Sequence, residues 1–195
     1  MHAICAFLAL FAAPFWEAKA PADWTSEEVV LLMSDSPWAR PATAGSKVPS
    51  EAVQTYLASA APMRQAELEA ARRFRRKRVE QGAPDDYREF LEAQAGQSIV
   101  LAVRFPDWNA LADATESRQM EAETLMRAGR RKYKMSGHFP PTPSDPYLRL
   151  VFPRDAVKPG DKTIVFELYL PGVPSSYRMA EYLVRDLVYR GKPEM

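Results

Sequence analysis

The run SIVLAVRF at residues 98–105 constrains the fold more than any other segment of this chain. It is apolar and β-branched throughout, which is typical of a central strand. Residues 147–152 and 162–170 then alternate apolar with polar side chains, as half-buried strands do. Gly160 marks a turn between these two segments, and Gly172 marks a turn after the second. The C-terminal third is therefore predicted to be β.

The last segment, residues 177–190, fits two structures. Met179, Leu183 and Val184 would suit one face of a helix. Leu183 and Leu187, however, alternate with charged residues, and no N-cap box precedes the segment. We predict a strand, with a helix as the alternative.

Helices are predicted in the first half of the chain. Thr25 and Glu28 have the spacing of a capping box ahead of an apolar run. That helix ends at residues 34–37, because proline disfavours helix in the residue before it. Trp24 and Trp38 flank this helix and are expected to pack beneath it.

A longer helix is predicted over residues 62–81 from apolar spacings of three and four. Its inner face consists of Met63, Ala66, Ala70, Phe74 and Arg78. A short helix follows over residues 85–94, capped by Asp85 or Asp86 and closed by Gly96.

A further helix is predicted to open at Pro106-Asp107 and to end at Gly129. Its buried stripe consists of Trp108, Leu111, Thr115, Ala122 and Met126. Short strands are predicted at residues 51–59 and 130–135, and loops at residues 41–49 and 139–146. This order of elements predicts an α+β fold, a mostly antiparallel sheet with helices packed on one face.

The N-terminus has the features of an export signal. Residues 4–15 are an apolar run of h-region length, too short to span a bilayer. A-x-A cleavage patterns end at Ala20 and at Ala22. We therefore expect a signal peptide at residues 1–22 and one domain at residues 23–195. The alternative is a buried N-terminal helix.

Composition excludes several classes of protein. The formal net charge of +1 gives no global field for nucleic acid. Cys5 is the single cysteine, and His2 and His138 are the two histidines, so disulfide scaffolds and multi-histidine metal centres are excluded. All eight glycines are isolated, which excludes G-x-G and Walker phosphate loops. We expect neither a cofactor nor a metal.

The acidic candidates for catalysis are few. A glycoside hydrolase needs two carboxylates ~5–9.5 Å apart. The candidates are Asp85, Asp86, Asp107 and Asp113. Helix capping explains the first three as well, and a solvated helix face explains Asp113. His138 lies in a Gly/Phe/Pro segment without a diagnostic partner, and we interpret it as a turn residue.

Two basic tracts are the most distinctive local feature. They lie at residues 72–78 (RRFRRKR) and 127–134 (RAGRRKYK). Their candidate binding residues are Arg72, Arg75, Arg76, Arg130, Arg131 and Lys132. Such tracts contact the phosphates of anionic lipids or polymers, or simply form a solvated helix face with i,i+4 ion pairs.

Several short elements together resemble an uncharacterised family of exported bacterial proteins, found mainly in acidobacteria. They are Trp24-Thr25, Ser36-Pro37-Trp38-Ala39, residues 59–66 (SAAPMRQA), residues 99–103 (IVLAV) and the ending at residues 186–194 (DLVYRGKPE). In similar proteins the chain ends in a strand leading to Gly-Lys-Leu-Glu, where Pro193 stands here in place of leucine. The resemblance implies export and a C-terminal strand, and it implies no activity.

Two functions are therefore expected as alternatives. The first is a non-enzymatic, exported binding domain of the cell envelope. Its partner would be an envelope protein or an anionic polymer or lipid surface, with no nucleic acid and no transmembrane segment in the mature chain. The second is a carboxylate-dependent hydrolase that acts on envelope glycans. A cavity holding two acids would favour the second.

Overall fold

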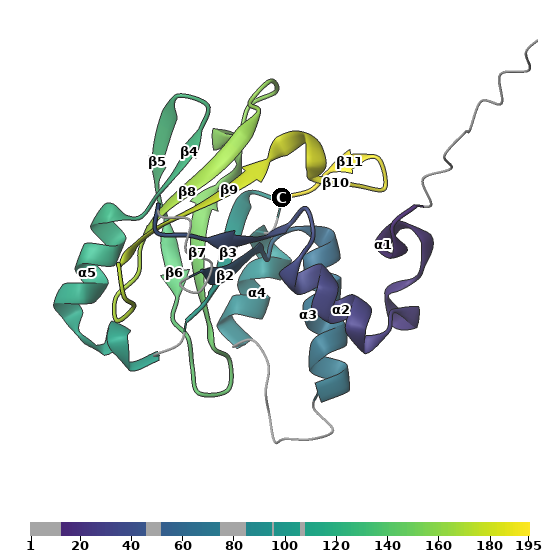
Figure 1. Ribbon diagram of the computed structural model, residues 1–195, viewed down its shortest axis with the longest axis horizontal. Helices are drawn as coiled ribbons and strands as arrows, with labels where there is room; N and C mark the ends of the chain where they lie inside the picture. The colour runs from purple at the N-terminus through teal and green to yellow at the C-terminus, as the bar shows by residue number, and fades with distance from the viewer. Residues whose placement is uncertain (1–12, 46–51, 75–84, 95, 106–107) are drawn as a thin grey trace, which may run out of the picture.

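The computed structural model describes residues 13–45, 52–74, 85–94, 96–105 and 108–195. Its strands form two main antiparallel sheets, and helices cover one face of the larger sheet (Figure 1). The predicted α+β fold, with mostly antiparallel strands and helices on one face, is confirmed.

The larger sheet has five strands in the order β1-β2-β3-β7-β6. Their bounds are Ala39–Ala42 for β1, Val53–Leu57 for β2, Ser98–Arg104 for β3, Tyr147–Pro153 for β7 and Gly137–Phe139 for β6. The predicted central strand is β3, which pairs with β2 on one side and β7 on the other. All of its residues except Arg104 are buried, because layers cover both faces of the sheet.

The smaller sheet has four strands in the order β5-β4-β8-β9, and it packs on the face of the larger sheet that the helices do not cover. Their bounds are Arg131–Lys134 for β5, Leu125–Ala128 for β4, Thr163–Tyr169 for β8 and Tyr177–Leu183 for β9. The rings of Phe152 in β7 and Phe166 in β8 lie 5.2 Å apart between the sheets. Thr55 Oγ1 lies 2.8 Å from the hydroxyl of Tyr182 in the same layer. Many of the apolar core side chains therefore lie between the two sheets.

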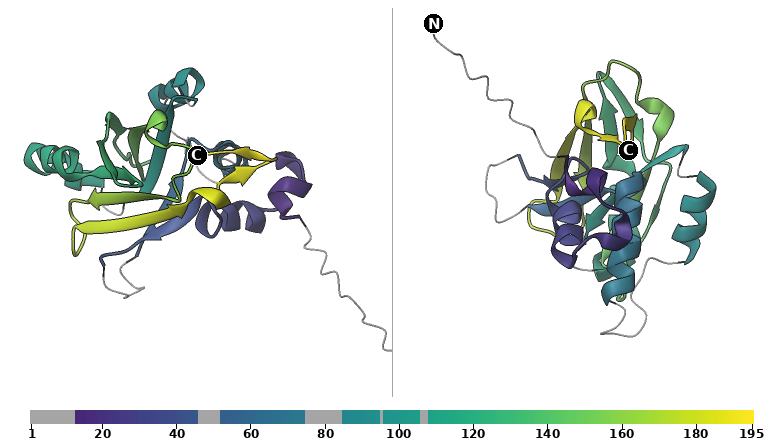
Figure 2. Two further views of the ribbon diagram at one scale, coloured as in Figure 1. Left: turned by 90° about the horizontal axis from the view of Figure 1, so that it is seen from above. Right: turned by 90° about the vertical axis from the view of Figure 1, so that its right-hand side faces the viewer.

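Three helices form a layer on the face of the larger sheet that points away from the smaller sheet. They are α2 (Ser26–Ser34), α3 (Ala61–Phe74) and α4 (Asp85–Gln94), and α3 lies between the other two (Figure 2). The capping box of α2 is confirmed, since Thr25 and Glu28 each bond the other's backbone N–H at 2.8–3.1 Å. Trp24 and Trp38 are buried as predicted. The inner face of α3 is also confirmed at Met63, Ala66 and the partly buried Ala70; residues 75–84 lie outside the described residues.

The helix predicted from Pro106 to Gly129 is wrong in its extent. A 3-10 turn spans Trp108–Ala112, α5 spans Ala114–Glu123, and β4 follows directly. Asp113 starts a new helix because its carboxylate accepts the backbone N–H groups of Thr115 (2.7 Å) and Glu116 (3.4 Å). Met126, assigned to the helical stripe, is buried in β4, where pairing with both β5 and β8 decides the structure.

The remaining predictions need smaller corrections. Pro41 belongs to β1 rather than to a loop, because β1 pairs with β2 and its neighbour Thr43 pairs with Met179 of β9. The strand predicted at residues 177–190 is confirmed as β9, which a 3-10 turn at Val184–Asp186 separates from β10 (Val188–Tyr189). A two-strand hairpin joins β10 to β11 (Lys192–Pro193).

The described N-terminal segment lies against the folded domain. Its helix α1 (Phe15–Ala18) sits beside the β10–β11 hairpin (Figures 1 and 2). Glu17 accepts the backbone N–H of Arg190 at 2.7 Å, and Lys19 pairs with Glu28 at 2.5 Å. Residues 1–12 lie outside the described residues. Within the described ranges, no helix has the length and apolar character to cross a membrane.

Candidate functional site

A charged side chain lies at the centre of the helix-covered face of the larger sheet. Arg149 of β7 is 3% exposed, and its neighbours in register are Ala102 of β3 and Phe139 of β6. Tyr56 of β2 follows beyond Ala102 in the same row. Arg149, Ala102 and Tyr56 therefore form one row across the sheet, with the small side chain of Ala102 between the two larger ones.

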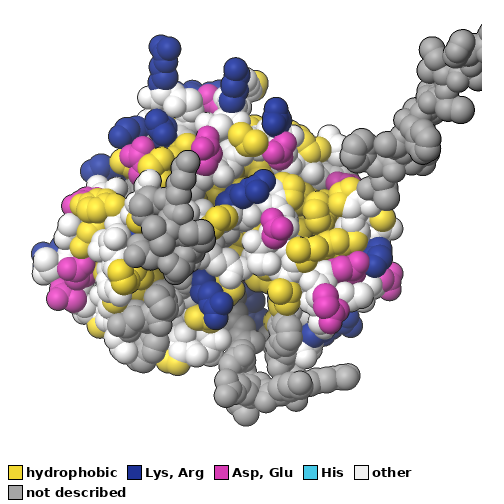
Figure 3. All heavy atoms as spheres, viewed as in Figure 1, with side chains coloured by type: hydrophobic (Ala, Val, Ile, Leu, Met, Phe, Trp, Pro, Cys, Tyr) yellow, Lys and Arg dark blue, Asp and Glu magenta, His cyan; other side chains and the backbone are white. Residues whose placement is uncertain are grey.

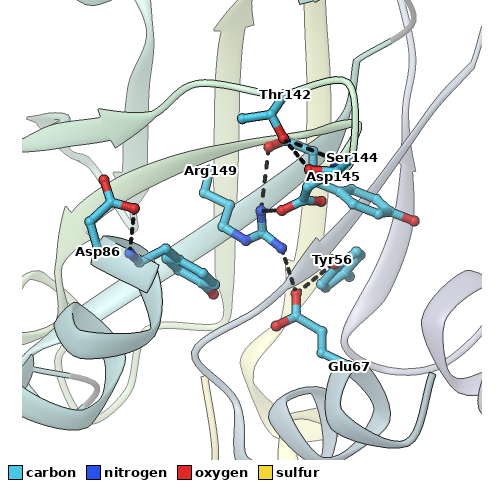
Figure 4. A network of polar contacts seen from close by, with 9 residues as sticks. Tyr56, Glu67, Asp86, Thr142, Ser144, Asp145 and Arg149 are labelled. Carbon is cyan, nitrogen blue, oxygen red and sulfur yellow. Dashed lines mark hydrogen bonds and ion pairs between the residues drawn. The ribbon is translucent and has the colours of Figure 1, made fainter. Parts of the chain in front are cut away.

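Arg149 holds two carboxylates from distant parts of the chain (Figure 4). One terminal nitrogen donates to Asp145 Oδ2 at 2.5 Å, and the other donates to Glu67 Oε1 of α3 at 3.2 Å. The hydroxyl of Tyr56 donates to the same glutamate oxygen at 2.7 Å. Asp145 is itself placed by a tight turn, in which its backbone pairs with Thr142. Six residues make up what we call the Arg149 cluster: Arg149, Asp145, Glu67, Tyr56, Tyr87 and Tyr147.

Aromatic rings enclose the guanidinium. Its central carbon lies 4.2 Å from the ring centroid of Tyr87 on α4 and 5.8 Å from that of Tyr147. Burial lowers the pKa of Arg149, but the surrounding carboxylates and tyrosines outweigh burial and raise it well above its usual range. Burial and the Glu67 charge raise the pKa of the Tyr56 hydroxyl. The cluster therefore holds a permanently charged arginine among neutral phenols.

A cavity of about 430 Å³ opens beside the Arg149 cluster, a volume within the usual range for small-molecule sites. Its walls come from α2, α3, α4, β2, β7 and the turn before β7. Apolar side chains make up much of the lining, including Val30, Met33, Leu68, Ala71 and Leu91. Val30 and Leu68 are 54% and 60% exposed, so the rim of the cavity is apolar and open to solvent.

Several hydrogen-bond donors on this cavity have no partner among the described residues. They are Arg64 Nε, Arg149 Nε and the Tyr87 hydroxyl, each of them buried. Buried polar groups in folded proteins are nearly always paired, because an unpaired one costs about 1–3 kcal/mol. These three groups belong to residues that line the cavity, whereas the other unpaired buried groups, such as Trp24 Nε1 and Arg178 Nε, belong to residues elsewhere.

The sequence did not single out any member of this cluster. Arg149 lies in a segment of alternating pattern, where a charged residue normally indicates the solvent face of a strand. One sequence signal could have indicated that Arg149 is buried. Tyr147 and Val151, two positions before and after it, lie on the same face of the strand and are apolar. Its partners, Glu67 and Asp145, carry no local signal, since folding alone brings them together.

The acidic candidates from the sequence do not gather at this cavity. Asp85 pairs with Arg88 on the exposed side of α4, and Asp86 bonds the backbone N–H of Tyr87 at 2.9 Å. Asp113 is a helix cap rather than a residue on a solvated helix face, and its backbone hydrogen bonds lower its pKa. Asp107 lies outside the described residues.

His138, expected in a turn, lies instead in β6 because it pairs with β7. Its Nδ1 atom is 3.5 Å from Glu121, and no nucleophile completes a catalytic arrangement in the contacts that the structure describes. Within the described ranges, no three His, Cys, Asp or Glu side chains gather in a way that would hold a metal ion.

The basic candidates that the structure describes lie at two separate places. Arg72 is at the C-terminal end of α3 and pairs with Glu69 at 2.8 Å, while Arg75 and Arg76 lie outside the described residues. Arg130 is exposed in the turn between β4 and β5, at the opposite end of the view (Figure 1).

In β5, Arg131 pairs with Asp161 at 2.5 Å and Lys132 with Glu167 at 3.3 Å. Lysine and arginine side chains project at this upper edge of the molecule (Figure 3). The described members of the two tracts therefore lie apart, and Arg72, Arg131 and Lys132 each pair with a carboxylate.

Three of the short elements that resemble the exported family meet at the C-terminus. The indole N–H of Trp38 donates to the carbonyl oxygen of Glu194 at 2.8 Å. The Glu194 carboxylate accepts the backbone N–H of Ala61, the first residue of α3, at 3.1 Å. These contacts join the C-terminal end of the chain to Trp38 and to the start of α3.

Comparison with known proteins adds no family to this geometry. No protein-family description, curated protein or solved structure matches the chain. The cavity and the Arg149 cluster are therefore the features of this chain from which a function is proposed below.

Proposed function

We propose that the protein is an exported, non-enzymatic binding domain of the cell envelope and that it binds its ligand in the cavity beside the Arg149 cluster. The observation that carries this proposal is the set of buried donors without partners at the wall of an apolar cavity. Rigid elements hold these donors, since Arg149 is in the middle of a sheet and Arg64 and Tyr87 are on helices. Preformed donors of this kind lower the entropy cost of binding.

The alternative, a hydrolase with two acids, would have to use Glu67 and Asp145, the acids on the cavity wall. Arg149 donates to an oxygen of each, which orients both carboxylates as acceptors. A general acid must instead carry a proton toward the leaving group. The ion pairs therefore favour binding over hydrolysis.

Export rests on the sequence at the N-terminus. The apolar run and the A-x-A patterns ending at Ala20 and Ala22 support it. Fractionation of a bacterial host that expresses the chain tests this part: the protein is expected outside the cytoplasm, with Pro21 or Asp23 at its N-terminus. Recovery of the full-length chain in the cytoplasm would contradict export.

The cavity is tested with a neutral apolar dye, Nile red, whose fluorescence rises in an apolar site. Leu68→Ser removes an exposed part of the rim and is expected to weaken dye binding several-fold while leaving the fold intact. The matched control is Leu31→Ser, because Leu31 is 46% exposed on the neighbouring helix α2 and is not part of the cavity wall. Equal dye binding by the two variants would contradict a ligand site in this cavity.

A further inference from the structure

Arg64 differs from the other arginines on the cavity wall. Arg88 pairs with Asp85, and Arg149 pairs with two carboxylates. Arg64, on α3, forms no ion pair with any residue that the structure describes, and its Nε is buried without a hydrogen-bond partner. Arg64 is only partly buried and pairs with neither carboxylate of the Arg149 cluster, so its guanidinium is available to an anion that enters the cavity.

The surroundings of Arg64 are apolar. Leu68 lies one helical turn further along the same face of α3, and Val30 and Met33 of α2 line the same cavity. Leu68 and Val30 are more than half exposed, an unusual position for two large apolar side chains that share a cavity. A cation thus lies beside an open apolar surface.

The acids on the cavity wall are engaged by Arg149 and not by Arg64. Glu67 and Asp145 are already engaged by Arg149, so neither is free to pair with Arg64 or with a cationic ligand. The tyrosine faces around Arg149 are occupied by its own guanidinium, which leaves no open aromatic cage for a quaternary ammonium group. Arg64 and Arg149 together balance the two carboxylates, and Arg64 is the guanidinium on this wall that has no ion pair among the described residues.

We infer that the cavity binds an amphipathic carboxylate, a molecule with one carboxylate group and an alkyl chain. Arg64 binds the carboxylate, a geometry that the guanidinium fork favours. The alkyl chain lies along Val30, Met33 and Leu68 and removes their apolar surface from water. This inference rests on the proposed binding function and names its ligand class.

The test is displacement of Nile red from the full chain by dodecanoate and by its neutral counterpart, dodecanol. Arg64→Gln is expected to weaken dodecanoate binding about 10–100-fold, because hydrogen bonds to charged groups contribute about 1.5–3 kcal/mol. Dodecanol should displace the dye equally from both proteins. Arg118→Gln on α5, away from the cavity, is the charge-matched control and should bind dodecanoate as the parent does.

Two results would overturn the inference without touching the proposed function. One is equal dodecanoate binding by the parent and Arg64→Gln; the other is stronger displacement by dodecyltrimethylammonium than by dodecanoate. In both cases the dye still binds in a Leu68-dependent manner, so the cavity remains a ligand site of another chemistry. If Leu68→Ser leaves dye binding unchanged, the proposed function fails, and this inference fails with it.

Discussion

Two regions of this protein join distant parts of the chain, and they do so in different ways. The Arg149 cluster links β7 to α3 over 82 residues and borders an open cavity. The other region, here called the terminal junction, consists of Phe15, Trp16, Trp24, Trp38, Tyr189 and Glu194. It links Trp38 to Glu194 over 156 residues.

The terminal junction is filled by aromatic rings in edge-to-face contact. Phe15 lies 5.8 Å from Trp24, and Trp16 lies 6.0 Å from Trp38, measured between ring centroids. Trp38 in turn contacts Tyr189 at 6.3 Å. Packing of this kind stabilises a fold.

Each region holds a buried donor without a partner among the described residues, Trp24 Nε1 in the junction and Arg149 Nε in the cluster, but of the two regions it is the cluster that borders the open cavity. The two regions therefore differ in their surroundings: rings fill the terminal junction, whereas the cluster borders the cavity in which we propose that the ligand binds. Cleavage after Ala20 or Ala22, as we propose for export, would leave the junction without Phe15 and Trp16.

Removing the arginine of the cluster should have the largest effect. Arg149→Met leaves Glu67 and Asp145 without their cation, and such a loss typically costs about 3–5 kcal/mol of the free energy of unfolding. Urea denaturation measures it. Adding Glu67→Gln and Asp145→Asn to the same chain should recover part of the loss. A loss of only about 1 kcal/mol, typical of an exposed ion pair, would contradict the burial of the cluster.

High pH should have the second-largest effect on the free energy of unfolding, through the tyrosines of the cluster. Burial raises the pKa of Tyr56 and of Tyr87 well above the usual tyrosine value. Above about pH 10 the unfolded chain therefore loses these protons first, and the free energy of unfolding falls by about 1.4 kcal/mol per pH unit for each tyrosine. Urea denaturation between about pH 9 and pH 11 measures the slope.

Tyr56→Phe is the control for this slope. The variant should show a shallower alkaline loss, while Tyr182, whose pKa burial also raises, contributes equally to both proteins. An identical slope in the variant would show that the Tyr56 hydroxyl ionises as freely in the folded state as in the unfolded chain.

The terminal junction is tested by removing residues 1–20. The shortened chain loses the rings of Phe15 and Trp16 and the bond from Arg190 to Glu17, but it keeps the fully buried Trp38. We expect the free energy of unfolding to fall by about 1–2 kcal/mol, because both rings are only partly buried. Nile red binding should not change. Weaker dye binding in the shortened chain would mean that the two regions are coupled.

A smaller effect is expected at the end of the chain. Glu194→Gln removes the negative charge at the start of α3, where a carboxylate typically contributes about 0.3–1 kcal/mol. The bond from Trp38 goes to the backbone of Glu194 and remains in the variant. Thermal denaturation compared with Glu181→Gln, an exposed glutamate in β9, measures the effect. Equal melting temperatures would show that Glu194 does not act as a cap.

The basic hairpin should give the smallest change in stability. Replacing Arg130, Arg131 and Lys132 by Gln is expected to change the free energy of unfolding by about 0–1 kcal/mol, as for exposed ion pairs. Sedimentation with anionic vesicles at low salt tests the anionic partner that the tract suggests. Loss of vesicle binding in the variant would assign that partner to the hairpin, a site separate from both regions compared above.

The sequence by itself determined the elements whose signals are local. The capping box at Thr25 and Glu28 placed α2, and the apolar run at residues 98–105 placed the central strand. Alternation identified β7, β8 and β9. These predictions hold because a cap, a period or a run depends on neighbouring residues, whose geometry the backbone fixes.

Only the tertiary structure decided the features that depend on distant residues. Met126 lies in a strand rather than a helix because β8 pairs with it from 40 residues away. Arg149 is buried because Glu67 and Asp145 compensate its charge, whereas the same alternating segment without them would place an arginine in solvent. The apolar cavity likewise exists only where α2, α3 and α4 meet the larger sheet. A charge is stable inside a protein only with its partners, and its partners are known only when the chain has folded.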